Sequence, residues 1–263
     1  GTATITATSD SVEATAAATV AQAAASIELS DTVLSFTSLG DGVRLVATVR
    51  DAAGNVISGA IVAWATSDAS VATVSSAGLV TAIADGTATI TATSGSVSAT
   101  ATATVSQTAA SVTLSPTSLS FTSIGDTTTI VATVRDAGGT VISNPTVTWV
   151  TSNSSVATVS SAGLVTAIAD GTATITATSG SASATATATV SQVAATVELS
   201  PSSLAFQSLG DTATLVATVK DAGGTVIPGA GVTWATSSAF IVTVSSAGLA
   251  TAVADGTATI TAT

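Results

Sequence analysis

Residues 171–178 read GTATITAT, and this stretch decides the fold class. Its hydrophobic period is two, because Ala173, Ile175 and Ala177 share one face of an extended chain and the threonines share the other. Such alternation is typical of a half-buried β-strand, and β-branched threonine suits the solvent-facing side. No stretch of the chain shows the spacing of an amphipathic helix. The sequence therefore predicts an all-β protein.

The same eight letters recur from positions 1, 86, 171 and 256, so the sequence has a period of 85. Residues 71–95 and 156–180 are identical letter for letter. This period is too long for one coil of a solenoid and suits a small domain that folds alone. We expect three repeats and, before them, the last two strands of a truncated repeat, with the third repeat lacking its last strand. Their predicted bounds are 1–20 for the truncated repeat and 23–105, 108–190 and 193–263 for the three repeats.

Each repeat is predicted to be a β-sandwich. In the second repeat, residues 128–135 (TTIVATVR), 146–150 and 183–190 alternate as residues 171–178 do, and turn signals such as Asp-Ala-Gly-Gly separate the runs. Seven or so short strands at such intervals are typical of a sandwich. The seams between repeats, such as Ser-Gln-Thr at 106–108, are short and have neither glycine nor proline at their centre. We therefore expect limited bending and a rod.

Large aromatic residues stand at inward strand positions and are the expected core residues, because an isolated large aromatic there is far more often core than ligand platform. They recur with the period of the repeats and are Trp64, Trp149, Trp234, Phe36, Phe121 and Phe206.

The composition argues against enzymatic catalysis, metal binding and several classes of partner. The chain has no histidine and no cysteine, so its serines lack the usual base of a hydrolase triad and the commonest soft metal ligands are missing. Fifteen acidic against four basic residues give a net charge of −11, which disfavours nucleic acid and anionic lipid as partners. No apolar run is long enough for a membrane span. We expect no enzymatic activity, no cofactor, no metal and no membrane insertion within this segment.

The acidic residues stand mostly at turns, once per turn in each repeat, and are interpreted as turn residues. Calcium sites need several clustered oxygen ligands, and the seams at 105–109 and 190–194 contain no acid. Rigidity of the array is therefore not expected to depend on calcium.

The run from 112, VTLSPTSLSFTSIGDTTTIVATV, and the run from 147, VTWVTSNSSVATVSSAGLVTAIADGTATITAT, resemble the bacterial immunoglobulin-like (Ig-like) domain of group 2. The likeness covers the whole chain in consecutive copies, and DAGGTVISNPTVTW is also similar to the sister group 1. Members occur in adhesins, large bacterial surface proteins and phage particles. The resemblance implies tandem Ig-like β-sandwich domains, one per period, an extracellular spacer or adhesive role, and the tryptophans in the core.

The ends of the sequence admit two interpretations. Either the chain is a segment of a longer array, or residues 11–20 (SVEATAAATV) complete the last repeat of a neighbouring molecule by adding the strand that residues 181–190 form in the second repeat. The first interpretation is favoured. Strand addition would leave residues 1–8 and the identical residues 256–263 competing for one strand position. Strand addition would make Ser11, Val12, Ala14 and Val20 intermolecular contacts.

Phe240 replaces the serines found in the other two copies, Ser70 and Ser155. It is a second candidate contact, with the alternatives that it folds back over Trp234 or is drift.

The expected function is structural: a component of an extracellular filament or cell-surface stalk, with the chain itself as partner through head-to-tail contacts. The alternatives are an adhesin that binds cell-surface glycans or cells, and a phage-particle decoration.

Overall fold

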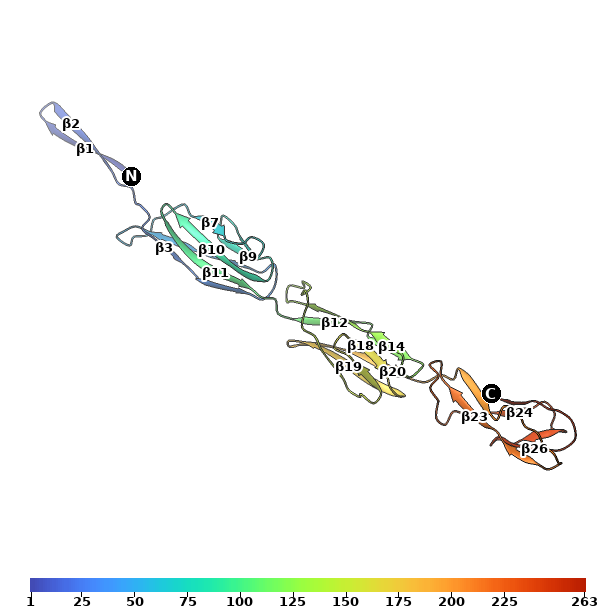
Figure 1. The fold of residues 1–263 in the computed structure, drawn as a ribbon. Helices are drawn as coiled ribbons and strands as arrows, with labels where there is room; N and C mark the ends of the chain where they lie inside the picture. Colours follow the sequence, from blue (N-terminus) through green and yellow to red (C-terminus); the bar gives the residue numbers. More distant parts are fainter. The chain divides into compact units, whose positions relative to one another are not determined.

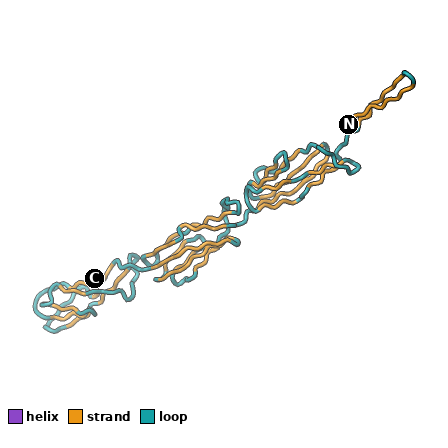
Figure 2. Tube along the Cα trace, turned by 180° about the vertical axis from the view of Figure 1, so that it is seen from behind, coloured by secondary structure: helices purple, strands orange, loops and turns teal.

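The structure, a computed structural model, describes residues 1–263 and consists of strands and turns (Figures 1 and 2). The predicted all-β class is confirmed. None of its segments is a helix of the length and apolarity that a bilayer span requires. The chain forms two compact units, one of Gly1–Ser111 with Val134–Pro145 and one of Val112–Thr133 with Thr146–Thr263.

Repeat 1 (residues 23–105) contains nine strands, two more than the seven or so expected, because residues 26–36 and 42–50 each break into two strands that belong to different sheets. They are β3 (Ser26–Leu29), β4 (Val33–Phe36), β5 (Gly42–Arg44), β6 (Ala47–Arg50), β7 (Ala63–Thr66), β8 (Ala72–Val74), β9 (Leu79–Ala82), β10 (Gly86–Ser94) and β11 (Val97–Val105).

These strands form a four-stranded sheet of order β4-β11-β10-β7, a three-stranded sheet of order β5-β9-β8 and the pair β3-β6. All neighbours are antiparallel except β4, which lies parallel to β11. Along β10 the side chains of Ala88, Ile90 and Ala92 are buried, with more exposed threonines between them. The period of two read from the sequence therefore places the core on the inner faces of the sheets.

Repeat 2 (residues 108–190) follows the same plan one period later. Its strands are β12 (Ser111–Ser115), β13 (Ser118–Phe121), β14 (Thr127–Thr129), β15 (Val131–Arg135), β16 (Thr148–Thr151), β17 (Ala157–Val159), β18 (Leu164–Ala167), β19 (Gly171–Ser179) and β20 (Ala182–Val190). The prediction that Ala173, Ile175 and Ala177 point inward is confirmed, because each is at most 1% exposed.

One predicted strand is wrong. Residues 128–135 do not form a continuous strand but break at Ile130, whose N–H donates to the carbonyl of Gly163 at 2.9 Å. The segment before the break, β14, pairs with β18, whereas β15 after it pairs with β12. Ile130 is 1% exposed, so the break is the point where the chain changes sheets while keeping one side chain in the core.

Repeat 3 (residues 193–263) contains seven strands. They are β21 (Thr196–Ser200), β22 (Thr212–Thr214), β23 (Val216–Lys220), β24 (Trp234–Thr236), β25 (Val242–Val244), β26 (Leu249–Ala252) and β27 (Ile260–Ala262). Two strands of repeat 2 have no counterpart here. Residues 203–206, which correspond to β13, are irregular, and no segment takes the place of β20.

Before repeat 1, β1 (Thr2–Ser9) and β2 (Val12–Thr19) form an antiparallel hairpin that pairs with no other strand (Figure 1, blue). Its register, Thr2 opposite Thr19, is that of Thr172 opposite Thr189 in repeat 2.

Candidate functional site: repeat junctions and an open groove

The seam after repeat 1 is held by a glutamine. Gln107 follows β11, and its backbone N–H donates to the Asp85 carboxylate at 2.8 Å. Its side-chain Nε2 donates to Oδ2 of Asp136, also at 2.8 Å. Asp136 starts the turn after β15 of repeat 2, so one glutamine connects an acid from each of two consecutive repeats.

The Asp136 carboxylate accepts hydrogen bonds from three segments of the chain. Besides Gln107, the backbone N–H of Leu39, in the turn after β4 of repeat 1, donates to Oδ2 at 3.0 Å. The N–H of Thr140 donates to Oδ1 at 2.8 Å within the turn itself. Asp136 is only 2% exposed. A carboxylate this buried depends on its donors, because losing one leaves an acceptor without water to replace it.

The backbones approach closely at the same place. A Cβ added to Gly138 would lie 3.2 Å from the carbonyl oxygen of Leu39, so the turn of repeat 2 packs on the chain of repeat 1. Leu39, Gln107 and the 134–145 loop all belong to the same compact unit. The contact is therefore part of that unit and not a loose encounter between domains.

The next junction has the same construction. Asp221, 1% exposed, accepts hydrogen bonds from the N–H of Ile124 at 3.0 Å, from Nε2 of Gln192 at 2.9 Å and from the N–H of Thr225 at 2.8 Å. The N–H of Gln192 donates to Asp170 at 2.7 Å. Recurrence of every contact one period later indicates that the junction is specified by the sequence and is not an accident of one turn.

These hydrogen bonds favour the charged form of both aspartates. The bond from Gln107 is the largest cause that lowers the pKa of Asp136 below 3.8; burial opposes it, and the backbone donors support it. Gln192 has the same effect on the pKa of Asp221. No group of three or more His, Cys, Asp or Glu side chains is placed to hold a metal ion.

The sequence interpretation missed this site. It treated Asp136 and Asp221 as turn residues only and found no acid in the seams, since both acids come from a turn 29 residues downstream of the glutamine that they bind. The available signal was the fixed spacing of glutamine and aspartate in all three copies, at Gln22 and Asp51, Gln107 and Asp136, and Gln192 and Asp221.

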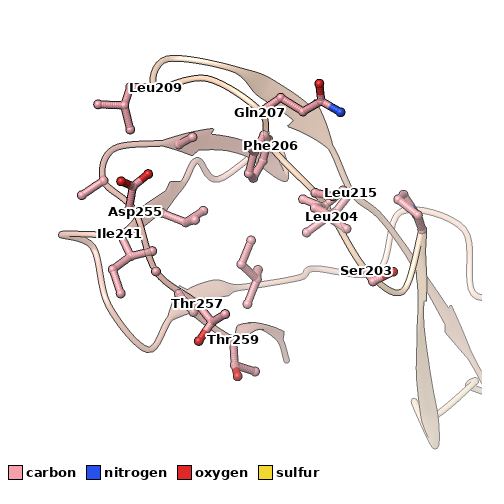
Figure 3. Close-up of a pocket in the computed structure, with 18 of the residues that line it drawn as sticks. Ser203, Leu204, Phe206, Gln207, Leu209, Leu215, Ile241, Asp255, Thr257 and Thr259 are labelled. Carbon is pink, nitrogen blue, oxygen red and sulfur yellow. The ribbon is translucent and has the colours of Figure 1, made fainter.

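A second feature is an open groove in repeat 3 with a volume of about 710 Å³. Leu204, Phe206, Leu215 and Ile241 line it and point into it, as Figure 3 shows. In repeat 2, β20 fills this place and lies parallel to β13. Ile260, at the rim, is half-buried, whereas its counterpart Ile175 is fully buried. The groove is therefore the uncovered core of the third sandwich.

The residues expected in the core have two kinds of surroundings. Phe36 and Phe121 are buried, at 3% and 4% exposure, whereas Phe206 is half-buried because it lines the groove. The three tryptophans are half-buried, and Trp64 packs against the core cluster of repeat 1.

A glycine with a left-handed backbone lies against each indole ring. Gly78, at φ +78°, lies so close to Trp64 that an added Cβ would be 3.0 Å from the ring, and Gly163 and Gly248 repeat this against Trp149 and Trp234.

The residues expected to make intermolecular contacts are exposed. Ser11, Val12, Ala14 and Val20 belong to the N-terminal hairpin or its immediate flank, where Val12 and Val20 are 71% and 72% exposed. Phe240 is 87% exposed, so the interpretation that it folds back over Trp234 is wrong.

Comparison with known protein families gives three matches. The family described as "Bacterial Ig-like domain (group 2)" matches residues 23–105, 108–190 and 193–263. No curated protein matches the chain. Among solved structures, invasin, a bacterial integrin-binding protein, is similar at 20% identity and a TM-score of 0.41, covering 90% of this chain and 55% of invasin.

Two further solved structures are similar. The Escherichia coli adhesin FdeC has 19% identity and a TM-score of 0.36, with 92% of this chain and 90% of FdeC covered. The S-layer protein SbsC has 21% identity and a TM-score of 0.33, and the match covers 92% of this chain but only 37% of SbsC. The three consecutive family matches cover most of the length of this chain. The chain therefore belongs to the bacterial Ig-like domain (group 2) family.

Proposed function

We propose that the chain is a structural segment of a cell-surface or extracellular protein, a spacer in which tandem Ig-like domains provide length and resist bending. Family membership supports the extracellular setting, and the repeat junctions support the mechanical role. The proposal includes no enzymatic activity and no cofactor.

The buried aspartate at each junction is the observation that carries this proposal. Asp136 keeps all its donors only while the turn of repeat 2, the seam and the turn after β4 stay in register. Bending at the seam would pull at least one N–H away from a carboxylate that water cannot reach. A junction of this kind holds the turn of repeat 2 against repeat 1, which a spacer needs and a flexible linker does not provide.

The charge suits the same role. At −11 over the chain, copies side by side repel one another, which opposes uncontrolled lateral association of a β-rich surface. Nucleic acid and anionic lipid remain poor partners for the same reason.

Surface labelling tests the proposal. Antibodies raised against the 263-residue chain should label intact cells of the source organism, and mild protease treatment of those cells should remove the signal. Labelling that appears only after the cells are permeabilised would contradict an extracellular spacer.

Phe240 supports a second candidate function, an adhesin. An aromatic side chain that is 87% exposed, where the other copies carry serine, is the one copy-specific aromatic loop residue of the array. Exposed aromatic residues commonly mark binding surfaces, here for cell-surface glycans or neighbouring cells.

Binding to glycan arrays and to cells decides between the two. An adhesin loses binding on Phe240→Ser but keeps it on Ile61→Ser, a control that also removes an exposed apolar side chain, 88% exposed. Absence of any binding by the unmodified chain leaves the spacer as the function.

A further inference from the structure

We propose that a pocket in repeat 1, lined by Arg44 and Trp64, binds one sugar ring that carries a carboxylate, the chemistry of a uronic acid in a glycan. This inference goes beyond the spacer role, which requires no ligand. It is also separate from the Phe240 loop, which belongs to repeat 3.

Three parts of repeat 1 surround this pocket, which has a volume of about 270 Å³. Arg44 comes from the end of β5, Trp64 from β7, and Ser76 and Ala77 from the turn between β8 and β9. That turn lies close against the indole, because a Cβ added to Gly78 would be 3.0 Å from the ring. The pocket is smaller than the roughly 300–1,000 Å³ of sites for drug-sized ligands, so it suits one sugar ring.

Arg44 differs from the other basic side chains in having no partner. Of the four, Arg50 and Lys220 form ion pairs with glutamates, and Arg135 donates to a backbone carbonyl. Arg44 is exposed and makes neither an ion pair nor a hydrogen bond, and no acidic residue lines the pocket. The free guanidinium is therefore a local positive site in an acidic chain, and its planar fork matches the two oxygens of a carboxylate.

The remaining polar groups of the pocket are also free to bind. The indole N–H of Trp64 and the hydroxyl of Ser76 donate to no protein group, and no buried side-chain nitrogen or oxygen lacks a partner, so both groups reach water. Trp64 is half-buried and packs on the core cluster of repeat 1, which fixes the ring. A fixed indole offers an apolar face with a donor at its edge, and a sugar ring offers C–H groups and hydroxyls to match.

Repeat 3 shows which part of the pocket the fold does not require. Every residue of the lining except Arg44 has an identical counterpart there, among them Trp234 and Ser246. Threonine takes the place of Arg44 in both other repeats, as Thr129 and Thr214. Because two of three sandwiches form with threonine at this position, the guanidinium is not needed for folding and is available for a ligand.

The charge of the whole chain limits the kind of ligand. A net charge of −11 repels a polyanionic polysaccharide, although salt screens this repulsion beyond about 8 Å at physiological ionic strength. A glycan with one carboxylate gains the contact with Arg44 and brings little further negative charge near the acids. The ligand is therefore an isolated acidic sugar in an otherwise neutral glycan.

NMR titration of the full chain with methyl glucuronide tests the inference, and methyl glucoside is the neutral control with the same ring. We expect the glucuronide to shift the indole N–H signal of Trp64, identified by its loss in Trp64→Phe, with a dissociation constant of about 1–10 mM. Arg44→Thr, which copies the residue of the other repeats, should weaken binding about tenfold or more. Phe240→Ser should leave binding unchanged.

A second variant moves the site. Thr214→Arg added to Arg44→Thr places the guanidinium beside Trp234, and the glucuronide should then shift the indole signal of Trp234 in place of that of Trp64. This gain of binding cannot result from a folding defect.

Three results would overturn the inference. The first is the absence of any indole shift at about 50 mM glucuronide, well above the expected dissociation constant. The second is an equal shift with methyl glucoside, which would show that the carboxylate is not recognised. The third is equally tight binding of acetate, which would indicate a site for any carboxylate, including that of a peptide. None of these results bears on surface labelling, so the spacer role is tested separately.

Discussion

Asp51 and Asp136 begin the same turn in consecutive repeats, yet only one is buried. Both accept a hydrogen bond from a glutamine 29 residues earlier, Gln22 at 2.9 Å and Gln107 at 2.8 Å. Asp136 also accepts from the N–H of Leu39 in the preceding repeat. Asp51 has no such donor, and the carboxylate oxygen that binds its glutamine also accepts from the Asn55 side chain, at 3.3 Å.

The residue two positions after the aspartate also differs between the repeats. Repeat 1 carries Ala53 where the other repeats carry Gly138 and Gly223. An added Cβ at either glycine would lie 3.2 Å from a carbonyl oxygen of the preceding repeat. Ala53 is exposed. The turn is therefore a local motif whose aspartate and glycine acquire a second role only where a preceding sandwich packs on them.

The largest expected difference between the two turns is in amide hydrogen exchange when the aspartate is removed. In Asp136→Ala the Leu39 amide loses a charged acceptor, and its hydrogen exchange should accelerate on the order of a hundredfold. Asp51→Ala should leave exchange at Leu39 unchanged. Exchange measured by NMR at each amide checks both; equal protection of Leu39 in the two variants would mean that Asp136 does not hold the junction.

Removing the glutamine should have a smaller effect. Gln107→Ala leaves a buried carboxylate one donor short and should lower the free energy of unfolding by about 1.5–3 kcal/mol. Gln22→Ala should cost less than about 1 kcal/mol, since water can replace the donor at the less buried Asp51. Urea denaturation followed by tryptophan fluorescence compares them, and equal losses would contradict a special role for the junction.

Acid should weaken the junction. The pKa of Asp136 in the folded protein lies below its ordinary value of 3.8, so its contribution to stability is complete above that value and is lost as pH falls through the lower, folded value. The stability difference between the unmodified chain and Asp136→Asn should therefore be constant near neutral pH and shrink below about pH 4. Denaturation at neutral pH and at about pH 2.5 measures this, and a difference that grows in acid would reverse the assigned sign.

The smallest loss of stability is expected from substituting Gly138. Gly138→Ala needs the carbonyl of Leu39 to shift by a few tenths of an ångström, which should cost on the order of 1 kcal/mol. At Gly139, φ is +83° but a Cβ meets nothing within 4 Å, so Gly139→Ala is the control for backbone strain alone. Unchanged protection of the Leu39 amide in Gly138→Ala would show that the close approach is not needed.

The sequence predicted the strands well where the period of two is long, as at residues 171–178. It failed at residues 128–135, because alternation continues through Ile130 while the chain changes sheets. Exposure of Phe240 was not predictable either, since the pattern gives the direction of strand residues and not of a loop side chain. The full junction was not predicted because the bond from the Leu39 N–H to Asp136 joins residues 97 apart in the sequence and forms only where two sandwiches meet.

Distance measurement between spin labels tests most directly whether a buried aspartate couples consecutive repeats. The chain has no cysteine, so Ser98→Cys and Ser143→Cys, both exposed and in the same compact unit, place one label on repeat 1 and one on the loop of repeat 2 that contains Asp136. We predict a narrow distance distribution in the otherwise unmodified chain and a clearly broader one when Asp136→Ala is added. Equal widths in the two proteins would contradict the coupling.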